Sequence, residues 1–268
     1  MLTRWRTILF LSVLHGLIHG SMNIFPVIMQ GVARQFGWSL TQVSAVGTVG
    51  YVLFGVMALP SGWFADADRR TGLITILIGF LIGTSAIQFS ATWWIFITGW
   101  LFLCLSAGLY HPIGLSSVSI TYPDQTGSAM GWHGFGGNKG FAITPFVAGI
   151  LADFWGWEAA FLAALVPALL LLIWVGFSRV YPQDEGPPKI NEGHSVDWSK
   201  SLFVVLVVYG LIGFIYRGAV TFIPISFQMQ WSSGFSFGAI GGLASLVYAC
   251  GGLGQLLGGQ LEEQFPSR

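Results

Sequence analysis

Residues 37–66 read GWSLTQVSAVGTVGYVLFGVMALPSGWFAD, and residues 234–263 read GFSFGAIGGLASLVYACGGLGQLLGGQLEE. The second stretch resembles the first at an offset of 197 residues, and the aligned identities include Gly37 with Gly234, Ser39 with Ser236, Tyr51 with Tyr248, Gly55 with Gly252 and Gly62 with Gly259. Pro26 matches Pro224 at an offset one residue larger. Self-similarity of this kind indicates a duplicated structural unit, of which the chain holds one copy and the beginning of a second.

The composition excludes a soluble domain and predicts an integral membrane protein. Only 8% of residues are charged, 54% are hydrophobic and the mean hydropathy is +0.71. Arg70 and Asp124 enclose 53 residues without an Asp, Glu, Lys or Arg. At about 1.5 Å per residue this stretch makes roughly 80 Å of helix, against a hydrocarbon core of about 30 Å. It therefore predicts two spans, joined by a hairpin at residues 90–92.

Continuous apolar runs predict helices, because lipid offers the backbone no hydrogen-bond partners and barrel strands would alternate in polarity. We expect eight spans, at about residues 7–30, 42–62, 71–90, 93–118, 128–152, 158–178, 202–226 and 236–258. The basic start and first apolar run also resemble a signal peptide. We favour a membrane anchor, because the run is long, lacks an Ala-x-Ala cleavage pattern and precedes seven further spans.

The loop charges predict the orientation and the domains. If successive spans cross the membrane in alternating directions, Arg34 lies on one side of the membrane and the other loop cations lie on the opposite side. These cations are Arg4, Arg6, Arg69, Arg70, Arg179, Lys189, Lys200 and Arg268. This bias places the N-terminus in the cytoplasm and the protein in the cell (inner) membrane. We predict a six-helix N-terminal bundle at 1–178, a cytoplasmic linker at 179–200, and the first two helices of a truncated C-terminal bundle at 201–268. The net charge of zero argues against nucleic acid as a partner.

Two loops at matched places in the repeat share a glycine followed by an acid. They read SGWFADADRR at residues 61–70 and GQLEEQFPSR at residues 259–268. Both resemble the G-x-L-x-D-r-x-G-r-r loop of the major facilitator superfamily. The resemblance implies an all-α bundle and a loop that helps to lock the cytoplasmic gate, with Gly62, Asp66, Arg69, Arg70, Gly259 and Glu263 as the gating residues. Doubling the repeat predicts roughly 395 residues and twelve spans for the whole protein.

The fifth predicted span carries glycines and a proline in a pattern that resembles the antiporter-type signature of the same superfamily. We expect close backbone contact at Gly127, Gly131, Gly136 and Gly140, and a bend at Pro145. A narrower resemblance, to the fosmidomycin-resistance-like subgroup, rests on His15, on GLYHP at residues 108–112 and on GGNKG at residues 136–140. Members of that subgroup often carry an acid four residues after the first histidine, where this chain has His19.

Two cations lie inside predicted spans, whereas every Asp and Glu falls in a loop or at a span end. Lys139 lies near the middle of the fifth span and Arg217 near the middle of the seventh. A lone charge at this depth costs at least about 2.5–3.5 kcal/mol. The family resemblance implies that both spans line one central cavity, so we predict that Lys139, Arg217 and the neighbouring Asn138 bind a small anionic solute. A snorkelling lysine and a counter-ion elsewhere in the protein are the alternatives.

Four histidines are candidates for proton coupling. His15 and His19 are four residues apart, so they share one helical face near mid-membrane depth. An unperturbed imidazole pKa near 6.5 suits proton exchange. We expect His111 and His133 in the cytoplasmic third of adjacent spans, close to each other but at a different depth from the first pair. A hydrogen-bonded packing role is the alternative for each histidine.

These features together predict a secondary transporter that carries a small anionic solute by alternating access, with protons as the candidate coupling ion. The alternatives are proton-coupled efflux of a non-anionic drug or metabolite and, less favoured, a membrane-embedded enzyme that contains histidines. His15 and His19 have a spacing that suits one metal ion, but a third ligand is not visible in the sequence. We therefore predict no enzyme activity, no cofactor and no metal, and membrane lipid as the surrounding partner.

Overall fold

The computed structural model describes residues 2–177, 200–230 and 236–264, with side chains as far as Cys250, and these residues are helical without any strand. The α-helices are α1 (Leu2–Met22), α2 (Ile24–Phe36), α3 (Leu40–Val56), α4 (Ala58–Ala67), α5 (Arg69–Gln88), α6 (Trp93–Gly108), α7 (Tyr110–Thr121), α8 (Thr126–Trp155), α9 (Leu162–Phe177), α10 (Lys200–Gln230) and α11 (Phe237–Gln264). Short 3-10 helices lie at Pro123–Gln125 and Trp157–Phe161. The predicted linker lies outside the described residues except for Lys200, which begins α10.

The all-α membrane bundle predicted from the sequence is confirmed. Within the described residues, six stretches are long and apolar enough to cross a membrane: Arg4–Phe36, Leu40–Asp66, Arg69–Gln88, Trp93–Thr121, Trp157–Phe177 and Leu202–Phe227. The fifth predicted span, α8, is a 30-residue helix but is not among them. Its polar residues and glycines lower its mean hydropathy. Because α8 packs between α1 and α11, less of its surface is in contact with lipid and needs to be apolar.

Three of the predicted spans are broken helices. Single residues interrupt them: Asn23 between α1 and α2, Met57 between α3 and α4, and Leu109 between α6 and α7. The Asn23 amide N–H bonds the Gly20 carbonyl at 2.9 Å and its side chain bonds the His19 carbonyl at 2.8 Å. Because these bonds satisfy backbone groups at the break, the first span continues to Phe36, beyond the predicted end at residue 30.

The repeated serine begins the second span in both copies. The Ser39 hydroxyl accepts the Gln42 backbone N–H at 3.2 Å, and the Gln42 side chain accepts the Ser39 N–H at 2.9 Å, which forms a capping box. In the second copy the Ser236 hydroxyl accepts the Ala239 N–H at 3.1 Å at the start of α11. The sequence identity at this position therefore reflects a shared helix N-cap.

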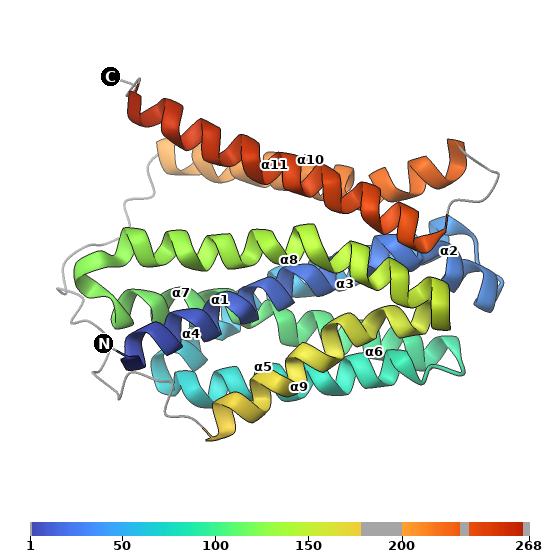
Figure 1. The fold of residues 1–268 in the computed structure, drawn as a ribbon, viewed down its shortest axis with the longest axis horizontal. Helices are drawn as coiled ribbons and strands as arrows, with labels where there is room; N and C mark the ends of the chain where they lie inside the picture. The colour runs from blue at the N-terminus through green and yellow to red at the C-terminus, as the bar shows by residue number, and fades with distance from the viewer. Residues whose placement is uncertain (1, 178–199, 231–235, 265–268) are drawn as a thin grey trace.

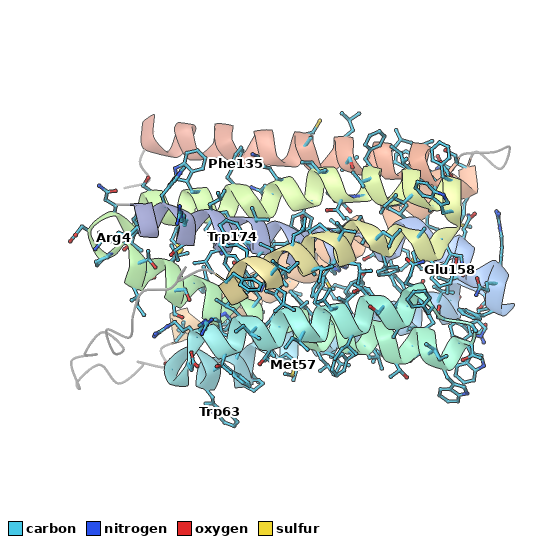
Figure 2. The ribbon with its side chains drawn as sticks, turned by 60° about the horizontal axis from the view of Figure 1, so that its bottom comes forward. Arg4, Met57, Trp63, Phe135, Glu158 and Trp174 are labelled. Carbon is cyan, nitrogen blue, oxygen red and sulfur yellow. The ribbon has the colours of Figure 1, made fainter. Side chains whose placement is uncertain are left out.

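The bundle is layered around α1 and α8. Figure 1 shows α8 between α1 and the pair formed by α10 and α11, while α5, α6 and α9 lie on the other side of α1. Large aromatic side chains fill the core of the first copy, including the fully buried Phe10, Phe25, Phe80 and Trp100. Other aromatic side chains face outward, and Trp63 is 78% exposed at the edge of the molecule (Figure 2). Such an outward apolar surface is expected of helices that face lipid.

Candidate functional site

Four histidines from three helices form one cluster inside the bundle. The Nε2 atoms of His15 and His19 on α1 are 2.9 Å apart, and Nε2 of His111 on α7 is 3.3 Å from Nε2 of His19. The His133 ring, on α8, stacks on the His15 ring with centroids 4.0 Å apart and planes 13° apart. The imidazoles therefore make a continuous polar group between helices that are otherwise apolar.

The predicted separation in depth between the two histidine pairs is wrong, because all four side chains meet. The expected depths would hold for unbroken spans with the predicted ends. The first span extends well beyond its predicted end, and the break at Leu109 directly precedes α7, the helix that carries His111. The assignment of His15, His19, His111 and His133 to proton coupling stays a prediction.

A chain of hydrogen bonds orients two of these rings. The Tyr110 hydroxyl donates to the Leu11 carbonyl at 2.6 Å, and its oxygen lies 2.9 Å from His133 Nε2. Since the hydroxyl proton is directed at the carbonyl, His133 Nε2–H donates to the tyrosine oxygen. The His133 backbone carbonyl in turn lies 2.8 Å from His15 Nδ1, which donates to it. Tyr110, to which the sequence analysis gave no role of its own, thus fixes the tautomer of His133, while the His133 carbonyl fixes that of His15.

Arg217 reaches from α10 of the second copy into the first copy. Its Nη2 donates to the Met22 carbonyl at 3.1 Å, and its Cζ lies 3.5 Å above the centroid of the Tyr51 ring. Its Nε is buried and has no hydrogen-bond partner. The guanidinium also lies close enough to His19 for the two groups to interact electrostatically. Arg217 therefore adjoins the histidine cluster and keeps one donor unused.

The repeated tyrosines, Tyr51 and Tyr248, make equivalent contacts in the two copies. The Tyr51 hydroxyl donates to the Met22 carbonyl at 3.2 Å, and the Tyr248 hydroxyl donates to the Val220 carbonyl at 3.1 Å. Met22 and Val220 are 198 residues apart, which is the offset of the matched prolines. The duplication thus preserves a bond between the first and second spans of each copy.

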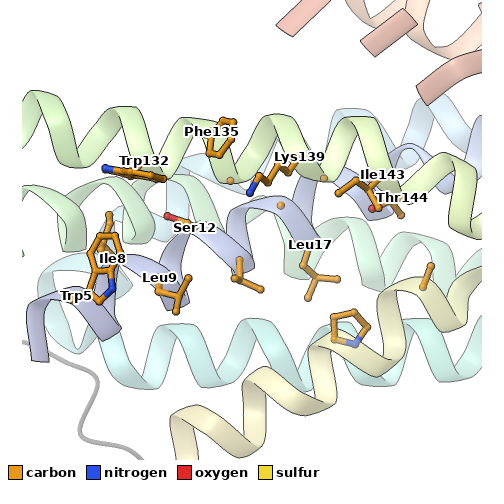
Figure 3. A pocket seen from close by; sticks show the side chains of 16 residues that line it. Trp5, Ile8, Leu9, Ser12, Leu17, Trp132, Phe135, Lys139, Ile143 and Thr144 are labelled. Carbon is orange, nitrogen blue, oxygen red and sulfur yellow. The ribbon is translucent and has the colours of Figure 1, made fainter. Parts of the chain in front are cut away.

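Among the residues that the structure describes, Lys139 and Arg217 do not line a common groove, contrary to the expectation of one site with two cations. Lys139 is exposed, with its Nζ 4.4 Å from the Phe135 ring centroid. It lines a groove of about 350 Å³ between α1, α8 and α9 together with apolar side chains such as Trp132 and Ile143 (Figure 3). Gly137 and Phe141, which contact His15 and His19, are each two residues from Lys139, about 200° around the helix. Asn138 is exposed as well.

Two of the four glycines expected to allow close helix contact do so. An ideal Cβ at Gly136 would overlap the Ser12 carbonyl, and one at Gly140 would overlap the Gly16 carbonyl. The prediction is wrong for Gly127 and Gly131, where a Cβ would meet nothing within 4 Å. Among these four glycines, the close contact therefore lies in the middle of α8, where it crosses α1.

The predicted gating loop is almost entirely helical. Helix α4 continues to Ala67, so the loop expected between the spans at 42–62 and 71–90 is reduced to Asp68. Asp68, rather than Asp66, caps the next helix, since its carboxylate accepts the Arg70 and Thr71 backbone N–H groups. The Thr71 hydroxyl bond, together with these backbone bonds, lowers the pKa of Asp68.

Close approach of helices at Gly62 is also not observed, since a Cβ there would meet nothing within 4 Å. Asp66 and Arg70 are exposed and Arg69 is partly exposed. Gly259 and Glu263 lie in the last turns of α11, beyond the described side chains. The gating role of all six residues stays a prediction.

The two copies meet along one end of α8, in a contact that sequence reasoning missed. The Asp153 carboxylate accepts the backbone N–H groups of Phe237 and Gly238, at 2.7 and 2.8 Å, at the start of α11. Nearby, Gly241 lies against the Pro145 carbonyl. A carboxylate at a helix N-terminus is stabilised by the unpaired amides and by the helix dipole. The contact therefore joins the first and second copies by charge as well as by packing.

With the helix order, the duplicated contacts and the central polar cluster established, a family model decides the assignment, since the model of the Major Facilitator Superfamily matches residues 11–268. The chain belongs to the major facilitator superfamily. It is a multi-pass membrane protein of a family of transporters, which disfavours the membrane-embedded enzyme.

Curated relatives of this superfamily chain transport or export different solutes. The probable hexose phosphate transport protein of Chlamydia pneumoniae is 28% identical over 131 residues, which are 45% of this chain and 28% of that protein. The tetracenomycin C resistance and export protein of Streptomyces glaucescens is 28% identical over 180 residues, which are 63% of this chain and 33% of that protein. The chain spans between 28% and 44% of the length of such relatives.

A solved structure of the same fold is a bacterial homologue of the human lysosomal transporter Spinster, in an inward-facing and occupied conformation. It superposes with a TM-score of 0.79 at 20% identity, covering 97% of this chain and 62% of that one. At this identity the likeness shows the fold alone.

Proposed function

We propose that the protein carries a small anionic solute across the membrane by alternating access, with Arg217 as the anion-binding residue. The observation that carries the proposal is the buried Nε of Arg217 without a hydrogen-bond partner. A buried donor left unpaired is costly, and a cation within a span is more so. An anionic oxygen at Nε would satisfy both the donor and the charge. Carboxylates and phosphates suit a guanidinium because they accept two parallel N–H bonds.

The rest of the site favours an anion as well. Arg217 rests on the Tyr51 ring and adjoins His19, and no carboxylate pairs with it among the residues that the structure describes. The similarity to proteins named as probable hexose phosphate transporters supports an anionic solute. The six-helix bundle, the two helices of the second copy and the orientation inferred from the basic loops are parts of the same proposal, with the two copies rocking about Arg217.

Uptake in proteoliposomes tests this proposal. We expect Arg217→Gln to lower uptake of the transported anion about 10- to 150-fold, since a hydrogen bond to a charged group contributes about 1.5–3 kcal/mol. Radiolabelled sugar phosphates, phosphonates and carboxylates are the probes. Lys139→Gln is the matched control, because Lys139 faces the groove and its loss should leave uptake within about twofold. Undiminished anion uptake by the Arg217 variant, with the Lys139 variant impaired, would refute the assignment.

Efflux of a non-anionic compound is the second candidate. It is favoured by the similarity to the tetracenomycin C exporter and to the methyl viologen resistance protein SmvA of Salmonella typhimurium, 23% identical over 216 residues. Phe141 and Tyr248, whose ring centroids are 5.7 Å apart near Arg217, add an aromatic surface that suits such compounds. Drug resistance that persists in the Arg217→Gln variant, without anion uptake in the wild type, would favour this function.

A further inference from the structure

Three of the clustered histidines, His15, His19 and His111, have ligand nitrogens that lie within 4.8 Å of one another. The Nε2 atoms of His15 and His19 come from adjacent turns of α1, and that of His111 comes from α7. We propose that these three nitrogens bind one divalent transition-metal ion of the zinc class. The sequence supplied only the first two ligands, and the structure adds His111 as the third.

The spacing of the nitrogens fits a tetrahedral ion. Zinc–nitrogen bonds of about 2.0–2.1 Å separate tetrahedral ligand atoms by roughly 3.3–3.4 Å. The His15–His19 and His19–His111 nitrogen pairs are 2.9 and 3.3 Å apart, and the ligand atoms of all three lie within 4.8 Å of one another. Small side-chain rotations would therefore bring the set to ligand geometry. Imidazole donors suit zinc, cobalt, nickel and copper rather than magnesium or calcium.

A metal-ligating histidine usually donates its second ring N–H to a carbonyl or carboxylate, which exposes the other nitrogen. His15 does so, because its Nδ1–H donates to the His133 carbonyl at 2.8 Å. The His133 ring stacks on His15 and is itself held by Tyr110. The first ligand is thus oriented by a surrounding shell before any ion arrives.

The proton count among the three nitrogens favours an added cation. With Nδ1 protonated, neutral His15 presents a lone pair at Nε2, and His19 Nε2–H donates to it. Because His19 Nε2 carries that proton, it has no lone pair to accept a bond from His111, so the 3.3 Å contact between His111 Nε2 and His19 Nε2 requires an unprotonated His111 Nε2. With the His19 proton moved from Nε2 to Nδ1, a metal ion among the three Nε2 atoms would use all three lone pairs at once.

The charges around the cluster define the fourth ligand. Arg217 on α10 lies near His19. Lys139 lies on the side of α8 that is turned away from the histidine cluster. Among the described residues, no carboxylate joins the cluster. An ion held by three neutral imidazoles keeps its full charge, so an anionic fourth ligand, hydroxide or a small anion, would offset both the metal and Arg217. This is the open coordination position of a three-histidine zinc site.

Cobalt and zinc binding to the purified protein, freed of any affinity histidines, tests the proposal without a transport assay. We expect one Co²⁺ per chain with the visible absorption of a tetrahedral ion, and displacement of that ion by Zn²⁺. His111→Gln and His19→Gln should each lower the affinity at least tenfold, since even loss of a residue behind the ligands costs about 10- to 100-fold. His194→Gln is the matched control, a histidine outside the described residues, and should bind as the wild type does.

Absorption spectroscopy at the zinc edge counts the imidazoles directly and does not depend on any variant folding. Three imidazoles per zinc would support the proposal, and two or fewer would overturn it. The absence of a tetrahedral cobalt spectrum from the wild-type protein would also overturn the proposal. The histidine cluster would then be a candidate for proton binding alone. Helix content and gel filtration of each variant identify loss of fold. Metal binding is measured without the transported solute. The uptake experiment with the Arg217 variant can therefore fail while metal binding is observed, and metal binding can be absent while anion uptake depends on Arg217.

Discussion

The crossing of α1 and α8 predicts opposite effects on stability for alanine substitutions at two glycines of α8. Gly140 lies so close to Gly16 that an ideal Cβ would overlap the Gly16 carbonyl, and the obstacle is backbone rather than a flexible side chain. Gly131 lies on the same helix, where a Cβ would meet nothing within 4 Å. We expect Gly140→Ala to destabilise the protein and Gly131→Ala to stabilise it.

The magnitudes follow from two opposing effects. Alanine is favoured over glycine in a helix by about 0.8–1.0 kcal/mol, which is the whole expected gain at Gly131. At Gly140 the same gain is opposed by overpacking, which typically costs about 1–3 kcal/mol. We expect a cost near the upper end of that range here, because two helix backbones must separate. The net loss at Gly140 is then about 1–2 kcal/mol. The two variants should differ by about 2–3 kcal/mol, or roughly 4–12 °C in Tm.

Thermal unfolding in detergent, followed with a thiol-reactive dye, measures this difference. Cys104 is buried and becomes reactive only on unfolding, while the exposed Cys250 reacts at once and sets the baseline. A Gly140→Ala variant that melts at or above the Gly131→Ala variant would refute the close packing of α1 on α8. It would also weaken the geometry of His15, because the Gly136 and Gly140 contacts flank Gly137, the glycine against which the His15 ring lies.

Two further predictions concern helix caps. Asp153→Ala should weaken the α8–α11 contact by about 0.5–2 kcal/mol, so that spin labels on the two helices show a broader and longer distance distribution; an unchanged distribution would contradict the cap. Asp68→Ala should lower the unfolding free energy at neutral pH. Because the folded pKa of Asp68 is lowered, its stabilisation is present above about pH 3.9 and is lost as the pH falls through the folded value. Wild type and variant should therefore converge in acid, and a constant difference in unfolding temperature would contradict this.

Sequence reasoning predicted the fold well because a bilayer leaves few solutions for an apolar chain. Long apolar runs must be helices, and the hairpin at residues 90–92 is where α5 gives way to α6. The breaks at Asn23, Met57 and Leu109 were not predicted, since hydropathy averages over a window and does not detect a local interruption. The loop between the spans at 42–62 and 71–90 was predicted too long, because hydropathy marks where the apolar run ends and helices such as α4 continue through charged residues beyond that point.

The candidate site was predicted less well, because helix rotation and depth are set by packing that a single sequence does not show. The helical period places Lys139 opposite Gly137 and Phe141, but which face turns inward depends on the glycine contact with α1. Likewise, the position of His111 depends on the break at Leu109. Arg217 lies beside the Met22 carbonyl and the Tyr51 ring, and its role in binding the solute stays a prediction.

The duplication itself now explains why the polar groups gather where they do. Arg217 lies 198 residues after His19, the offset that also relates Pro26 to Pro224, so the two side chains occupy equivalent positions in the two copies. They face each other closely enough to interact, and the equivalent tyrosines, Tyr51 and Tyr248, each bond a carbonyl of the preceding span. Residues related by a pseudo-twofold axis can approach each other only near that axis. The interaction of His19 with Arg217 therefore places the polar site near the axis between the copies, and in the proposed alternating access this site would stay central while each copy moves.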